Sequence, residues 1–60
     1  MRFEIHLSKD NQFYFVLKAR NGETIAISEM YLSKQMCRKG INSVRRNAII
    51  ARIDDKTFKI

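Results

Sequence analysis

Residues 13–28, FYFVLKARNGETIAIS, decide the fold of this 60-residue chain. Their first part, residues 13–19, alternates large apolar side chains with a second row of side chains at period two, which is typical of a half-buried strand. The turn sequence RNGE then leads into TIAIS at residues 24–28, a second stretch with the composition of a strand. The whole stretch therefore predicts two antiparallel strands joined by a short hairpin loop.

The length of the hairpin loop sets which side chains face the core. A two-residue turn would pair Leu17 with Ala26 and place the two isoleucines of the second strand on the face away from Leu17. A three-residue loop over residues 20–22 avoids this. It needs a left-handed residue at its last position, which Gly22 supplies. Because a slip of one residue turns a strand over, the three-residue loop is the better choice, and it pairs Leu17 with Ile25 and Phe15 with Ile27.

The segments on either side extend this hairpin. FEIHL at residues 3–7 alternates in the same way, with Glu4 and His6 on the polar face, which predicts a first strand antiparallel to the next. Ser33 is a good helix N-cap and Asn47 is a residue at which helices often stop. Between them an apolar stripe recurs at helical spacing and is expected to face the sheet. Its members are Met36, Cys37, Gly40, Ile41, Val44 and Ala48.

The C-terminal part completes one α+β domain over residues 1–60. IIARI at residues 49–53 has the β-branched composition of a fourth strand, and residues 54–60 have the pattern of a turn and a short tail. We therefore expect an antiparallel sheet with one helix packed on it.

A chain this short needs a supplement to its core, because about 60 residues bury only about 60% of the surface that the unfolded chain exposes. Disulfides, structural metals and oligomerisation are the usual supplements. Cys37 and His6 each occur once, so neither an intramolecular disulfide nor a zinc site with about four ligands can form. We therefore expect an oligomer without a metal or cofactor. No apolar run approaches the roughly 18 residues of a membrane span, which favours a cytoplasmic setting.

The positive charge lies in the second half of the chain. The net charge is +6, and residues 1–32 contribute nothing to it because their acidic and basic side chains balance. Residues 33–60 carry eight basic side chains against Asp54 and Asp55. The basic residues are Lys34, Arg38, Lys39, Arg45, Arg46, Arg52, Lys56 and Lys59. The predicted helix therefore holds most of the excess charge.

One set of residues, read in order from Phe15 to Ala48, forms a recognisable signature. Its members are Phe15, Leu17 to Ala19, Asn21 to Glu23, Ile25, Ser28, Glu29, Tyr31, Ser33, Lys34, Gly40, Ile41, Ser43, Val44, Asn47 and Ala48. With Phe3 to Ile5 added, the chain resembles the YegP-like family of small bacterial domains. It departs from the family at Met30, where a glycine is usual, and in the tail after residue 53.

The resemblance implies a β3αβ unit that occurs as a tandem repeat or as two identical subunits. In that arrangement the strands form a single sheet and the C-terminal strands are exchanged. The single unit here then implies a homodimer, exchanged through Ile49, Ile50, Ala51 and Ile53. The family carries no established activity, so the resemblance transfers no functional residues.

The residues give little support to catalysis. Cys37 and His6 are the only conventional candidates for a nucleophile and its base. Cys37 lies on the apolar stripe and His6 on the strand face turned away from it, so the sheet is expected to separate them. Asp54 and Asp55 are adjacent and their side chains diverge, and the two glycines do not form a phosphate loop. We therefore expect no catalytic residues and no enzyme.

The helix has two open interpretations. Lys34, Arg38 and Arg45 fall on one ridge and Arg46 on the next, with no acidic residue on the exposed surface. This surface is either a solvated face or a contact for phosphates, extended by Arg20 and Tyr31. The tyrosine in turn either stacks on a base or plugs an edge of the core.

Two classes of function follow. The first is a binder of an anionic ligand, such as a nucleotide-like molecule, an oligonucleotide or nucleic acid, held by the basic helix. The second is a protein-interaction module, such as a small phage- or mobile-element-type inhibitor, that docks on an acidic partner protein.

Overall fold

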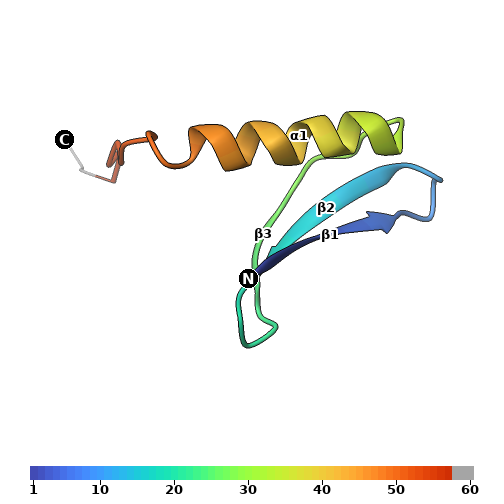
Figure 1. Ribbon diagram of the computed structural model, residues 1–60, viewed down its shortest axis with the longest axis horizontal. Helices are drawn as coiled ribbons and strands as arrows, with labels where there is room; N and C mark the ends of the chain where they lie inside the picture. The colour runs from blue at the N-terminus through green and yellow to red at the C-terminus, as the bar shows by residue number, and fades with distance from the viewer. Residues whose placement is uncertain (58–60) are drawn as a thin grey trace.

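The chain folds into a three-stranded antiparallel sheet with one helix lying across one of its faces (Figure 1). A computed structural model describes residues 1–57. The elements are β1 (Arg2–Leu7), β2 (Phe13–Lys18), β3 (Thr24–Ile27) and α1 (Lys34–Asn47). The strand order is β1-β2-β3, so the most apolar strand, β2, lies at the centre. The α+β class and the order of three strands and a helix are confirmed.

The β2–β3 loop is as predicted, but the register beyond it is not. Ala19 N–H donates to Glu23 O at 2.8 Å and Gly22 has φ of 91°, so the three-residue loop with its left-handed glycine is confirmed. A β-bulge between Leu17 and Lys18 then shifts the pairing by one residue. The expected pairs of Leu17 with Ile25 and Phe15 with Ile27 are therefore wrong.

The observed pairs place β3 differently from the expectation. Leu17 lies opposite Ala26 and Val16 lies opposite Ile27. Because directly opposed residues share a face, Ile27 lies with Val16 on the face without the helix, where it is 66% exposed. The bulge adds one unpaired residue, and no feature of the turn sequence announces it.

The predicted helix boundaries are confirmed. The hydroxyl of Ser33 accepts a hydrogen bond from Met36 N at 3.1 Å, which caps the first turn. The helix ends at Asn47. The segment before it is anchored to the sheet, since Tyr31 and Phe13 exchange two backbone hydrogen bonds of 2.6 and 2.8 Å.

The core is small and lies under the first half of α1. Phe15, Cys37 and Ile41 are buried. The ring of Phe15 meets the edge of Phe3 at a centroid distance of 5.7 Å and stacks on Tyr31 at 6.2 Å. The apolar stripe of the helix is thus confirmed for its central members.

The ends of the stripe are an exception. Met36 is 50% exposed and Ala48 is exposed, so neither packs on the sheet as expected. The helix runs on past the core, and Val44 is only partly covered.

Residues 48–57 do not form a fourth strand in this single chain. Residues 48–50 make a turn and residues 51–57 are neither helix nor strand. Figure 1 shows this segment leading away from the sheet, so its backbone meets no strand to pair with. Ile49, Ile50 and Ile53 are 86%, 80% and 95% exposed. The last part of the expected tail, residues 58–60, lies outside the described residues.

Replacing Gly40 with alanine should destabilise the protein although alanine favours helices. A Cβ there would lie 2.8 Å from Cζ of Tyr31, whose ring stacks on Phe15. We expect Gly40→Ala to lower the free energy of unfolding by about 1–2 kcal/mol, because overpacking outweighs the gain in helix propensity. Urea denaturation at fixed protein concentration measures this. Gln35→Ala, at an exposed helical position, is the matched control, and equal stability of the two variants would contradict the prediction.

Candidate anion-binding groove

The charged side chains of α1 are all basic. Its cationic residues are Lys34, Arg38, Lys39, Arg45 and Arg46, and the first turn holds no acidic residue. Within residues 1–57, the ion pairs are Arg2–Glu4, His6–Glu4 and Lys56–Asp54, so none of the helical cations is paired. This surface therefore presents unneutralised positive charge to solvent.

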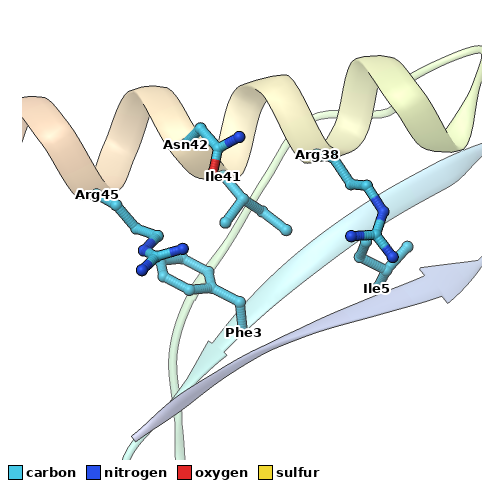
Figure 2. Close-up of a pocket in the computed structure, with 6 residues that line it drawn as sticks. All are labelled: Phe3, Ile5, Arg38, Ile41, Asn42 and Arg45. Atoms are coloured by element: carbon cyan, nitrogen blue, oxygen red, sulfur yellow. The ribbon is translucent and has the colours of Figure 1, made fainter.

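A groove between α1 and β1 collects part of this charge. We call it the anion groove, and it is lined by Phe3, Ile5, Arg38, Ile41, Asn42 and Arg45. Its volume is about 380 Å³. Figure 2 shows Arg38 and Arg45 reaching down from the helix toward β1, with Asn42 between them. The apolar side chains of β1 and the buried Ile41 form its floor.

The opposite face of the sheet carries Arg2 and Lys18 with Glu4, which neutralises only part of the positive charge there. The carboxylate of Glu4 accepts hydrogen bonds from Arg2 Nε at 2.8 Å and from His6 Nε2 at 2.9 Å. The bond with His6, followed by that with Arg2, lowers the pKa of Glu4 below its ordinary value. The carboxylate thus stays ionised beside these two groups. The helix side of the molecule is where an anion meets unpaired cations.

The structure brings together only some of the predicted site residues. Arg38 and Arg45 share the anion groove. Lys34 lies at the start of the helix, and Arg46 bonds back to Asn42 O at 3.4 Å. They therefore extend the basic surface without lining the groove.

Arg20 and Tyr31 lie elsewhere. Arg20 belongs to the β2–β3 loop, which Figure 1 shows on the side of the sheet away from α1. Tyr31 is half-buried, and its ring stacks on Phe15 and adjoins Gly40. One face of this ring is therefore occupied by the core.

Sequence reasoning missed Phe3 and Asn42 as groove residues. Asn42 follows Arg38 by four positions and precedes Arg45 by three, so helical spacing alone places all three on one ridge. That signal was available in the sequence. The sequence held no such signal for Phe3, because its place in the groove depends on which strand lies beneath this helical ridge.

The two conventional catalytic residues lie on opposite faces of the sheet. Cys37 is fully buried against Phe15, while His6 stacks on Tyr14 at 5.4 Å on the face without the helix. Burial raises the pKa of the Cys37 thiol. The sheet separates the pair, as expected.

Residues 1–57 contain neither a cluster of metal-ligating side chains nor a helix that could cross a membrane. Across residues 1–57, no group of three or more histidine, cysteine or acidic side chains gathers as metal ligands would. In the same part of the chain, no helix has the length and apolar character needed to cross a bilayer.

Comparison with known proteins identifies the family. The family described as "Domain of unknown function (DUF1508)" matches residues 8–55. The UPF0339 protein YegP of Escherichia coli strain K12 is 63% identical over 46 residues, which is 77% of this chain and 42% of that protein. A UPF0339 protein of Treponema denticola is 57% identical over 47 residues, covering 78% of this chain and 81% of the relative. The chain therefore belongs to the DUF1508 family of YegP-like proteins.

A structure supports the same conclusion. The NMR solution structure of a protein from Haloferax volcanii matches with a TM-score of 0.82 and 34% identity, covering 90% of this chain and 92% of that one. The chain spans less than half the length of the E. coli YegP protein that it matches. The resemblance to the YegP-like family is thus confirmed.

The thiol of Cys37 should be inert in the folded protein. It is buried and its pKa is raised, so a smaller fraction is thiolate at any given pH. We expect Ellman's reagent to react about 100-fold or more slowly in native buffer than in denaturant, relative to glutathione under each condition. Equal relative rates would show that the core opens freely.

Proposed function

We propose that this protein is a small, non-catalytic, cytoplasmic homodimer that binds an anionic ligand, a nucleotide-like molecule, an oligonucleotide or nucleic acid, through α1. The observation that carries the proposal is the row of exposed cations on this helix, none of them ion-paired within residues 1–57. Unpaired cations on a rigid element can bind phosphates without first breaking other ion pairs. The other sheet face holds fewer unpaired cations, because Glu4 forms an ion pair with Arg2 there.

The homodimer is supported by an incomplete core. A largely apolar groove of about 590 Å³ lies between the C-terminal half of α1 and the sheet. It is lined by Met1, Arg2, Phe3, Leu17, Val44, Arg45, Ala48 and Ile49. Isoleucines on the chain after the helix are exposed, and this segment has no strand partner in residues 1–57. Two such chains can exchange residues 49–53 so that these isoleucines fill apolar surface on the partner.

A protein-interaction module is the second candidate. Leu32 is 75% exposed and Met36 is 50% exposed beside the basic start of α1. Apolar side chains next to unpaired cations suit an acidic partner protein with its own apolar patch. A nuclease-treated pull-down with a purified acidic candidate separates this class from nucleic-acid binding, because only a protein contact survives the treatment.

Binding of a labelled single-stranded oligonucleotide should depend steeply on salt. If about three helical cations contact phosphates, the slope of log affinity against log salt concentration is about −2. Fluorescence anisotropy over a range of salt measures it. Arg46→Gln should reduce the slope by about 0.7. Lys18→Gln, with the same charge change on β2, should leave it unchanged. No binding at low salt, or a flat dependence, would contradict the proposal.

Ile53→Asp should weaken the dimer. Ile53 is 95% exposed in the single chain and gains burial only in the exchanged form. Burying such a side chain contributes about 1.5–3 kcal/mol, and the dimer would bury two copies, so we expect a rise of at least roughly 100-fold in the dissociation constant. Light scattering across a micromolar concentration series measures this. Arg52→Gln is the control, and a wild-type protein that is monomeric throughout would refute the dimer.

A further inference from the structure

We infer that the anion groove binds a single phosphorylated nucleoside, an inference that rests on the proposed anion binding by α1. The size of the groove limits the occupant. Its volume of about 380 Å³ lies near the lower end of ligand sites, which span roughly 300–1,000 Å³. One nucleotide fits this space, whereas a run of several nucleotides would leave it.

The two ends of the groove are suited to different chemical groups. Arg38 and Arg45 are seven residues apart, about 10.5 Å along the helix axis. Figure 2 shows Arg45 and Phe3 toward one end of the groove and Arg38 and Ile5 toward the other. A guanidinium next to an aromatic ring is suited to a planar base. The guanidinium of Arg38, at the aliphatic end of the groove, would then bind the phosphate by charge-assisted hydrogen bonds.

Asn42 supplies the recognition element between the two ends. Its amide offers both a donor and an acceptor, which matches the edge of a base or the hydroxyls of a ribose. No hydrogen bond from this side chain to another described residue occupies it in residues 1–57. A plain inorganic anion would leave both the amide and the aromatic floor unused.

The proposed dimer leaves the Arg38 end of this groove open. The apolar groove near Val44 is the surface that an isoleucine-rich strand fits. The rim of the anion groove instead carries two guanidiniums and an amide, which apolar side chains would cover without satisfying. The two grooves meet at Phe3 and Arg45, which line both, whereas Ile5, Arg38 and Asn42 line the anion groove and not the apolar groove.

The test is an NMR titration of the full chain at constant ionic strength. Adenosine 5′-monophosphate, adenosine and inorganic phosphate are the probes, and amide shifts report the binding site. We expect the nucleotide to bind at least about 10-fold more tightly than either fragment, since only it reaches both ends of the groove. The shifts should centre on Phe3, Arg38, Asn42 and Arg45.

Two matched pairs of variants locate the site. Asn42→Asp places a negative charge in the groove, and Ser43→Asp places the same charge on the adjacent exposed position. We expect the first to weaken nucleotide binding about 10-fold or more and the second to weaken it less than about 3-fold. Arg38→Gln and Lys39→Gln form the second pair, with the same expected contrast. All four positions are exposed, so circular dichroism should show folded proteins.

Four outcomes would overturn the inference. If both variants of each pair weaken binding equally, the nucleotide is attracted by the overall positive charge of the helix and not bound in the groove. If an oligonucleotide binds with the expected salt dependence but the mononucleotide does not, the proposed function stands and this inference fails. If the nucleotide binds only to the dimer-weakened Ile53→Asp variant, a second copy fills the groove. Absence of binding by every probe, the oligonucleotide included, would remove the proposed function as well.

Discussion

The packing of α1 on the ring of Phe15 is the contact on which the rest of the structure depends. Cys37 and Ile41 meet this ring, and the glycine between them lets the helix lie against Tyr31. Phe3 and Tyr31 then brace the ring from two sides. Because the buried cluster is so small, the position of the helix over the sheet is set by these few contacts. That position in turn sets which helical ridge lies above β1.

The same small core explains what the single chain leaves exposed. The first half of α1 is packed, while the half after Ile41 reaches beyond the buried cluster and opens an apolar groove beside Val44. The isoleucines that follow the helix have no surface of their own chain to cover them. Exposed apolar side chains beside an open, largely apolar groove support the proposed self-association, because a second copy could cover both.

The charges are separated by the sheet. On one face the carboxylate of Glu4 holds Arg2 and His6 in a local network that is close to neutral. On the other, the arginines of α1 stand above the apolar side chains of β1 without a carboxylate beside them in residues 1–57. Solubility alone accounts for scattered charge. A groove lined by donors above an aromatic floor is a more specific arrangement, and it gives the anion-binding proposal its location.

The sequence by itself determined the elements, the three-residue loop with Gly22 and the N-cap at Ser33, because each depends on local backbone preferences and periodicity. It also placed the cations on one side of the helix. Only the tertiary structure decided that a bulge beside Leu17 turns Ile27 away from the helix, and that Phe3 and Arg45 line the same groove. Both depend on contacts between segments distant in the chain. Pairing of residues 49–53 likewise depends on contacts outside this segment, since a strand forms only where another strand offers its edge.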